Sequence, residues 1–360
     1  MASHTRRSWM FGVAALSACT LLAVTLHAAM ASPGKSAAAP QDTAANASGK
    51  LIIYCGRSES LVGELIERFR AETGIQVQVK YGKTGPLASL ILEEGRRSPA
   101  DVFFAQDPGG LGLLAQAERL VQLPHDTLEQ VAYEHRDPMN RWVGVTGRMR
   151  TIAYSPARVK SADLPQTMMN LTDARWKGRI GWAPSNASFQ AFVTAMRHQL
   201  GEDVTEKWLR DMLANGVRTF PNNMPIVQAI CDGEIDLGLV NHYYVERFRT
   251  ERGDELVANH VPQGDAGEGD ICGALLVSGV AILESATNRA AAERFVAFLL
   301  SEKAQAYFAH ETFEYPLSLA VAARENVPAL GTLPARSIDL NQLGDLEETL
   351  VLLRKVGALR

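Results

Sequence analysis

From residue 50 onward, apolar residues recur with two different spacings that alternate along the chain. Residues 51–54 form a short apolar run and residues 75–79 alternate apolar with polar, and both patterns predict strands. Residues 60–73 and 86–94 carry apolar side chains at helical spacing, and each run ends at a glycine. Residues 101–106 predict a third strand. Strands and helices in this order are typical of an open, mostly parallel sheet.

The same order returns further along the chain. Residues 179–183 predict a strand, and a helix follows through Phe189 to Gly201. Residues 223–233 predict a helix with Asn223 as its cap, followed by a strand at 235–240 and a helix at 243–252. The chain is therefore expected to form a second α/β lobe. Its 360 residues are enough for two domains.

A long apolar segment at 274–283 predicts a strand, and a helix is expected at 288–300. A long strand so late in the chain suggests a return to the first lobe. We expect lobe 1 to hold residues 50–148 and 274–325, and lobe 2 to hold residues 149–273 and 326–360, with a hinge between them.

The first 49 residues differ from the rest. Arg6 and Arg7 precede an apolar stretch at 11–28 and the small-residue site that ends at Ala31, which predicts a cleaved signal peptide over residues 1–31. A membrane anchor is the alternative, but the stretch is weakly apolar for a span. Twin-arginine export and lipidation at Cys19 are less favoured variants, because the apolar stretch continues past the cysteine. Residues 32–49 predict a disordered leader.

Charge and cysteine content narrow the class of protein. Loss of the signal peptide removes two arginines and no acid, so 34 basic and 40 acidic residues give a net charge of −6. An acidic chain argues against nucleic acid as a partner. The three remaining cysteines, Cys55, Cys231 and Cys272, are odd in number and form no CxxC motif, which argues against a disulfide scaffold or a zinc cluster. A single disulfide between Cys231 and Cys272 is an alternative that the sequence leaves undecided.

Polar residues follow the predicted strands where each strand leads toward a helix. Ligands of open α/β sheets bind at these carboxyl ends. The candidates are Arg57, Ser58, Gln106, Asn186, Ser188, Asn223, Tyr243 and Tyr244.

The adjacent phenols of Tyr243 and Tyr244 suggest a metal. A turn between strand and helix allows two neighbouring side chains to face one point. A phenol has an ordinary pKa near 10, so phenolate at neutral pH needs strong positive potential, and a trivalent cation supplies it. Ferric iron favours anionic oxygen ligands, and tyrosinate suits it. Two phenolates leave such an ion short of ligands, which suggests an external anion such as carbonate or phosphate.

Backbone N–H groups near Asn186, Ser188 and Asn223 are suited to hold that anion, and Arg57, Arg148 and Arg150 are candidate counter-charges. Simpler interpretations exist for each. Adjacent aromatic residues are usually core packing, and the asparagines are equally compatible with helix caps. Arg148 and Arg150 alternate on a strand-like stretch and would then be solvated. His242 is expected at the surface, and Glu246 is a weaker candidate neighbour of the metal.

The chain resembles the periplasmic ferric-ion-binding proteins, the substrate-binding components of iron ABC transporters. The resemblance extends over almost the whole chain from Lys50. It rests on the segments at 53–58, 93–103, 147–150, 176–181, 233–236, 241–244 and 314–317. It implies an α/β, two-lobed type II periplasmic binding protein fold, a periplasmic location, and delivery of Fe(III) to an inner-membrane permease and its ATPase. It also implies a monomer that is not an enzyme.

The family's adjacent iron-binding tyrosines match Tyr243 and Tyr244. Its anion-binding positions match Asn186, Ala187, Ser188, Asn223 and Asn241, and its arginine pair matches Arg148 and Arg150. In related members, an arginine similar to Arg57 pairs with carbonate.

Three positions depart from the family pattern. Ser58 stands where some members have a histidine, Gln106 where they have a glutamate, and Phe189 where others have a third tyrosine. We expect Ser58 and Gln106 to line the cleft without the strong ligands of those members.

Two alternative functions stay open at this stage. The first is a receptor for an anionic or phosphorylated small molecule without iron, in which Asn186, Ser188, Asn223, Arg57 and Arg148 would carry the site. The second, a secreted enzyme, is weak. Ser58 has no histidine or lysine partner identifiable by spacing, and Asp107 lacks a paired carboxylate.

Overall fold

The computed structural model describes residues 50–253, 255–264, 271, 273–323 and 345–359. The predicted signal peptide and leader lie outside these residues. So does Cys272, and with it the Cys231–Cys272 bridge. The whole segment at 326–344 that leads to the last helix is also outside the described part. Among the described residues, no helix is both long and apolar enough to cross a membrane.

The first group of strands is built around β1 (Leu51–Cys55), which pairs in parallel with β2 (Val77–Tyr81) and β3 (Val102–Ala105). Helices α1 (Glu59–Thr73) and α2 (Thr84–Glu94) connect them, as predicted. Strand β2 begins two residues later than predicted. Its ladder opens where Leu51, the first residue of β1, pairs with Val77, and the Gln76 carbonyl just before it accepts from the Leu51 N–H at 2.8 Å.

The second group is built around β5 (Ile180–Trp182), which lies in parallel between β6 (Arg218–Thr219) and β7 (Leu237–Asn241). Its helices are α5 (Ala187–Leu200), α6 (Glu202–Ala214), α7 (Asn223–Cys231) and α8 (His242–Arg252). Predicted strands and helices are present here too, but the sequence analysis did not include α6 or the short β6.

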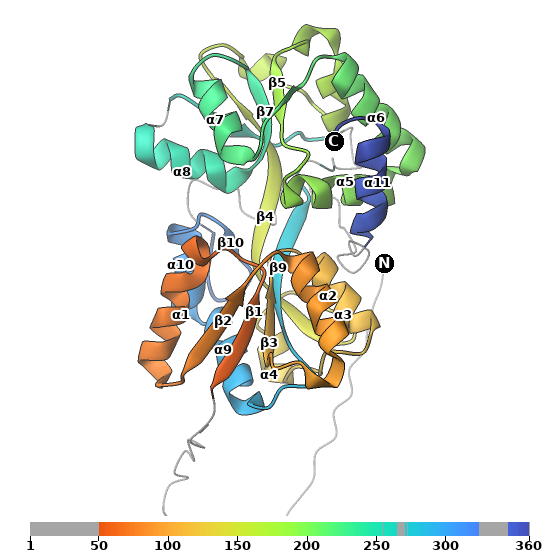
Figure 1. Ribbon diagram of the computed structural model, residues 1–360. Coiled ribbons are helices and arrows are strands. Elements are labelled where there is room, and N and C mark those ends of the chain that lie inside the picture. Colours follow the sequence, from red (N-terminus) through yellow and green to blue (C-terminus); the bar gives the residue numbers. More distant parts are fainter. Residues whose placement is uncertain (1–49, 254, 265–270, 272, 324–344, 360) are drawn as a thin grey trace, which may run out of the picture. The chain divides into compact units, whose positions relative to one another are not determined.

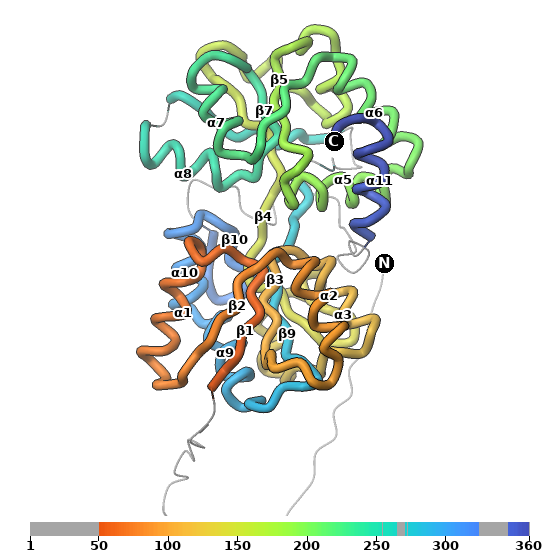
Figure 2. The backbone as a smooth tube through the Cα atoms, in the orientation of Figure 1, coloured from red at the N-terminus to blue at the C-terminus, as the bar shows by residue number. Residues whose placement is uncertain are grey.

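Two long strands, β4 (Trp142–Tyr154) and β9 (Leu275–Ile282), join the groups (Figure 1). The first part of β4 pairs antiparallel with β9 as far as Met149, and the second part pairs antiparallel with β7 from Arg150 onward. Strand β9 also pairs with β3. The resulting order is β2-β1-β3-β9-β4-β7-β5-β6, and β4 can be followed from one group to the other in Figure 2. Antiparallel strands therefore connect two parallel groups.

The remaining elements complete this framework. Two short strands, β8 (Ala258–His260) and β10 (Tyr315–Pro316), both pair with β4. The other helices are α3 (Pro108–Gln116), α4 (His125–Leu128), α9 (Arg289–Leu300), α10 (Glu302–His310) and α11 (Leu346–Lys355).

Helix α3 was not predicted, because its sequence contains three glycines. Packing explains one of these glycines, Gly110. A Cβ on Gly110 would lie 2.6 Å from Cγ2 of Thr84 in α2, so a larger residue would push α2 and α3 apart. The close contact between α2 and α3 therefore requires glycine at position 110, although glycine lowers the intrinsic helix propensity of α3.

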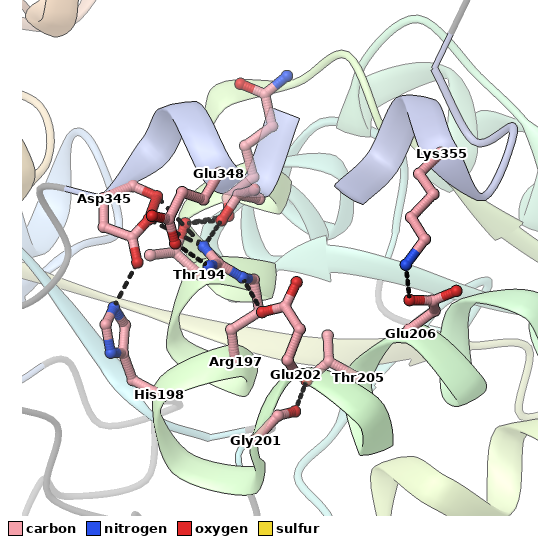
Figure 3. A network of polar contacts seen from close by, with 12 residues as sticks. Thr194, Arg197, His198, Gly201, Glu202, Thr205, Glu206, Asp345, Glu348 and Lys355 are labelled. Atoms are coloured by element: carbon pink, nitrogen blue, oxygen red, sulfur yellow. Dashed lines mark hydrogen bonds and ion pairs between the residues drawn. The ribbon is translucent and has the colours of Figure 1, made fainter. Parts of the chain in front are cut away.

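The C-terminal helix α11 packs against α5, and a buried cation of α5 makes most of the polar contacts between them (Figure 3). The Arg197 guanidinium of α5 is 9% exposed and contacts Glu202 at 2.6 Å, Asp345 at 2.9 Å and Glu348 at 2.7 Å. Thr349 of α11 accepts a further hydrogen bond from Arg197 at 2.9 Å. A single arginine thus binds both the residue that precedes α11 and the first turn of α11.

Arg197→Met is expected to lower the free energy of unfolding by about 2 kcal/mol, because it removes several hydrogen bonds to charged groups from a buried position. Urea unfolding measures the loss. Lys207→Met in α6 removes only an exposed ion pair with Asp211 and is expected to cost less than about 1 kcal/mol. Equal losses in the two variants would show that Arg197 does not hold α11 in place.

Candidate functional site

Tyr243 and Tyr244 lie in the first turn of α8, directly after β7. Their ring centroids are 4.5 Å apart with an interplanar angle of 32°, so the two phenols lie against each other. Tyr243 is buried and Tyr244 is half-buried. Asn241 Nδ2 donates a long hydrogen bond of 3.3 Å to the Tyr243 hydroxyl. The predicted pair of phenols therefore forms one local group at the start of a helix.

The Tyr243 hydroxyl has a pKa well above its ordinary value. Burial is the main cause, and the neighbouring Tyr244 raises it further, while Arg148 and the hydrogen bond from Asn241 act in the opposite direction. Tyr243 is therefore a neutral phenol in the metal-free protein. An added multivalent cation would supply the positive potential that a phenolate requires.

Arg148 is a buried cation beside the phenols. It is 1% exposed, and its Nη1 donates to Ser278 Oγ at 2.7 Å, whereas its Nε has no hydrogen-bond partner among the described residues. Burial lowers the pKa of the guanidinium, and the nearby Tyr243, Glu314 and Asp107 oppose that shift. A buried guanidinium with an unused donor is suited to bind an anion.

Arg150 lies two residues further along β4, on the same face of the strand. It is also 1% exposed. Its Nη1 donates to Asn223 Oδ1 at 3.1 Å and its Nη2 to Ser188 Oγ at 3.4 Å. The simpler alternative, that Arg148 and Arg150 are solvated, is wrong. Strand β4 is covered on both sides where it passes between the groups of strands, so both guanidinium groups are buried.

Asn223 does not cap α7 as predicted, because the cap is Asn222, whose side chain accepts from the Met224 N–H. Asn222 is exposed, whereas Asn223 is 1% exposed. The Asn223 Oδ1 accepts from Arg150, and its Nδ2 has no partner within the described part of the chain. The shift of the cap by one residue leaves a buried amide donor free beside Arg150.

Asn186, Ala187 and Ser188, here called the 186–188 turn, begin α5. Asn186 caps the helix, since its Oδ1 accepts from the Ser188 N–H at 3.1 Å and from Ser188 Oγ at 2.5 Å. The helix-cap interpretation of Asn186 is thus confirmed. Through Ser188 the turn also contacts Arg150, so the predicted anion-binding residues of α5, α7 and β4 form one connected group.

Arg57 is buried and already has an anionic partner. Its Nη2 contacts Glu314 Oε2 at 2.5 Å and its Nη1 donates to Thr146 Oγ1 at 3.0 Å. The structure therefore compensates the Arg57 charge within the protein. Ser58, the next residue, is exposed at the start of α1 and contacts Ser60 at 3.1 Å.

Gln106 is half-buried after β3. Its carbonyl oxygen accepts from Ser278 Oγ at 3.1 Å, and the same hydroxyl accepts from Arg148. The Gln106 Oε1 has no partner among the described residues. Gln106 is therefore linked to Arg148 through one serine, although its side chain is neutral.

His242 was expected at the surface. This expectation is wrong, because the residue is only 1% exposed. Its Nδ1 accepts from the Met149 N–H at 3.2 Å, and its Nε2 donates to the Phe313 carbonyl at 2.9 Å. Burial lowers its pKa to about 4, so the ring is neutral at physiological pH. One imidazole thus joins the start of α8 to β4 and to the segment before β10. Phe313 lies 71 residues away in sequence, so no local pattern indicates this contact.

Glu246 is 8% exposed and accepts a hydrogen bond from Asn259 Nδ2 at 2.9 Å. Within the described part of the chain, no group of three histidine, cysteine or acidic residues is placed to hold a metal. The phenols of Tyr243 and Tyr244 remain the strongest candidate metal ligands.

Two groups of parallel strands joined by antiparallel strands, with buried arginines and paired phenols near the junction, define a two-lobed type II binding protein. Residues 51–314 match the family of bacterial extracellular solute-binding proteins. The "Major ferric iron-binding protein" of Neisseria meningitidis is 31% identical over 325 residues, which cover 89% of this chain and 96% of the relative. The "Fe(3+)-binding periplasmic protein" of Serratia marcescens is 29% identical, over 88% and 93%.

Among solved structures, iron-bound HitA from Pseudomonas aeruginosa matches with a TM-score of 0.78 and 34% identity, covering 86% of this chain and 99% of that one. The chain belongs to the periplasmic ferric-ion-binding protein family of the extracellular solute-binding proteins. The predicted fold class is confirmed, and so is the prediction that the chain is a binding protein rather than an enzyme.

His242→Leu is expected to lower the free energy of unfolding by about 2 kcal/mol, because it leaves the Met149 N–H and the Phe313 carbonyl without their partner. The midpoint of urea unfolding measures this change. Tyr243→Phe, the neighbouring control, removes only a 3.3 Å hydrogen bond and is expected to cost less than about 1 kcal/mol. A His242→Leu midpoint equal to that of the control would contradict the structural role of the imidazole.

Proposed function

We propose that this chain is the periplasmic substrate-binding protein of an iron ABC transporter. It binds ferric iron through the phenolates of Tyr243 and Tyr244 together with a synergistic anion, and delivers the iron to an inner-membrane permease and its ATPase. Its relatives are named as ferric iron-binding proteins, two of them 29–31% identical over most of the chain. The signal peptide, the periplasmic location and a monomeric state belong to the same proposal.

The observation that carries this proposal is the contact between the two phenols at the start of α8. Their ring centroids are 4.5 Å apart, and the buried Arg148 lies close to Tyr243. Two hard oxygen donors in such a group suit a hard trivalent cation. Arg148 lowers the pKa of Tyr243, but burial outweighs it, so the phenolate forms only as the metal arrives.

The buried donors near the phenols support the synergistic anion. Arg148 Nε and Asn223 Nδ2 have no partners in the described part of the chain, and a buried donor without a partner is costly. Carbonate or phosphate would accept from both. The first N–H groups of α5 at the 186–188 turn add further donors. Asn241, which contacts the Tyr243 hydroxyl, lies between the metal and the anion in this scheme.

The anion must also complete the coordination of iron. Ser58 and Gln106 offer no charged oxygen or imidazole at their positions. Phe189 is fully buried and packs edge-on against Trp182 at 5.4 Å, so its position belongs to the core. With two strong protein ligands, iron takes its other ligands from a bidentate anion, from water, or from both.

A second function is supported by the two buried guanidinium groups on β4. Arg148 and Arg150 would bind an anionic small molecule without any metal, with Asn223 and Ser188 as neutral donors. The phenols would then only stack or donate hydrogen bonds. Colour separates the two functions, because ferric phenolate absorbs visible light and an organic anion alone does not.

The double variant Tyr243→Phe with Tyr244→Phe is expected to abolish ferric iron binding and its visible absorption band, because both phenolates are lost. Titration with ferric citrate and bicarbonate, followed by absorbance, measures the effect. The control Tyr133→Phe removes a phenol that is 61% exposed and should bind like the wild type. An unchanged titration in the folded double variant would contradict the proposal, as would a wild-type protein that stays colourless.

Asn223→Asp is expected to weaken bicarbonate-dependent iron binding by about tenfold, because the new carboxylate pairs with Arg150 and repels the anion. The matched control is Asn222→Asp. Aspartate keeps the cap of α7 there and adds the same charge at an exposed position. Iron affinity is measured at several bicarbonate concentrations. Equal effects of the two variants would place the anion away from Asn223.

A further inference from the structure

The first turn of α8 carries both tyrosines, so its orientation decides where the two phenols point. The helix backbone fixes the directions of neighbouring side chains relative to each other. A rotation of this turn about the helix axis therefore moves both hydroxyls together. Side chains that hold the turn from outside the helix set the direction of the proposed iron ligands.

Asn259 of β8 contacts this turn at two points. Its Nδ2 donates to the backbone carbonyl of His242 at 3.0 Å and to Glu246 Oε1 at 2.9 Å. The two acceptors lie one residue before Tyr243 and two residues after Tyr244, so one amide group spans the part of the helix that carries the phenols. Two anchor points oppose rotation of the turn, which a single anchor point would allow.

The oxygen of the Asn259 side chain is bound to the central strand β4. Its Oδ1 accepts from Thr151 Oγ1 at 2.7 Å, and Thr151 is fully buried. Asn259 also lies opposite Ala153 in the β4–β8 ladder, so the same strand holds its backbone. These contacts fix the amide with its oxygen toward β4 and its nitrogen toward α8. The side chain thus sets the distance between β4 and the start of α8.

Strand β4 thereby supports both parts of the proposed site from its two faces. Arg150 and Thr151 are neighbours in the strand, and successive side chains of a strand point to opposite faces. On one face, Arg150 contacts Asn223 and Ser188 of the proposed anion site. On the other face, Thr151 contacts Asn259, which in turn holds α8. The positions of the anion site and of the phenols therefore depend on the same segment of strand.

Glu246 is the stronger of the two anchor points. It is 8% exposed, and its Oε1 also lies 3.6 Å from Arg249 Nη1. Hydrogen bonds to carboxylates are stronger than those between neutral groups. Glu246 follows Tyr243 by three residues, so the two side chains lie on the same side of α8. The contact between Asn259 and Glu246 therefore holds the side of the helix that carries Tyr243.

We propose that Asn259 is a positioning residue for the proposed iron ligands. Its amide fixes the first turn of α8 relative to β4, so that the oxygens of Tyr243 and Tyr244 meet the metal together. Residues that orient metal ligands without touching the metal typically contribute about 10- to 100-fold to metal affinity. This inference rests on the proposed binding of iron by the two phenols.

Asn259→Leu tests the proposal, because leucine has a similar size but neither donates nor accepts a hydrogen bond. Ferric iron and bicarbonate are titrated into the protein, and the visible phenolate band is recorded per bound iron. Asn259→Leu is expected to weaken iron binding about tenfold. The band per bound iron should shift and weaken, because the phenolic oxygens meet the metal in a different geometry. A loss of stability alone would leave the band per bound iron unchanged.

The matched control is His260→Leu, at the next residue of β8. His260 is half-buried, and its Nε2 donates to the Pro165 carbonyl at 2.7 Å. Its side chain points to the opposite face of the strand from that of Asn259. The control therefore also removes a side-chain hydrogen bond from β8 but leaves the contacts with α8 in place. Its iron affinity and its band should equal those of the wild type.

Exchange of donor and acceptor provides a second test that keeps the size of the side chains. Asn259→Asp retains the acceptor for Thr151 but loses the amide donor and places a carboxylate against Glu246. It is expected to alter the band as Asn259→Leu does. The double variant Asn259→Asp with Glu246→Gln restores a hydrogen bond between the two positions, because the glutamine amide donates to the aspartate. Its band should return toward that of the wild type.

Three results would overturn the proposal. The first is a folded Asn259→Leu protein with the band and affinity of the wild type, and the second is an equal change of the band in His260→Leu. The third is a double variant no closer to the wild type than Asn259→Asp alone, and this comparison decides if Asn259→Leu does not fold. A wild type without the visible band would instead contradict the proposed function, and this inference with it.

Discussion

The structure depends on one strand that belongs to both parallel groups. Strand β4 changes partner from β9 to β7 between Met149 and Arg150, so its backbone hydrogen bonds hold the two groups in one sheet. Two guanidinium groups lie buried on one face of β4 at this crossing. Burying cations is costly unless they find partners. The neighbouring elements supply those partners through Ser278, Asn223 and Ser188, and leave some donors unused.

The buried hydrogen-bond donors without partners connect the fold to the proposed anion site. Arg148 Nε is buried close to Tyr243, and Asn223 Nδ2 is buried beside Arg150, so an anion from solution could complete their hydrogen bonds. In the proposed function, an anion bound there would bring negative charge beside Tyr243 and Tyr244, and a trivalent cation would neutralise the anion and the phenolates together. Iron and anion would then stabilise each other. Arg57, by contrast, has its charge paired with the carboxylate of Glu314, and it also donates to Thr146 of β4.

His242 and Arg197 position the site from outside it. His242 holds the start of α8, and so the phenols, against β4 and the Phe313 carbonyl. Arg197 holds α11 against α5, and Leu346 and Leu350 of α11 line a cavity together with Asn186 and Ala187. Both residues act through polar contacts between segments far apart in sequence. Their replacement would alter geometry rather than remove a ligand.

The sequence by itself determined the elements whose periodicity is local. Its patterns predicted most strands and helices of both groups, the long late strand β9, and the family through motifs spread along the chain. It also placed the two tyrosines at the end of a strand. These features follow from the spacing of neighbouring residues, which a linear pattern records. Helix α3 was missed because it contains three glycines, one of which, Gly110, allows close contact with α2 at the cost of helix propensity.

Only the tertiary structure decided which polar residues are buried and what they contact. His242, Arg148 and Arg150 look like surface residues in the sequence, yet each is 1% exposed. Their burial depends on segments that lie many residues away, such as Phe313 for His242 and Ser278 for Arg148. The cavity likewise needs α2, α3, α5 and α11 together. Local patterns report the preferences of single elements, whereas burial and cavities arise only where several elements meet.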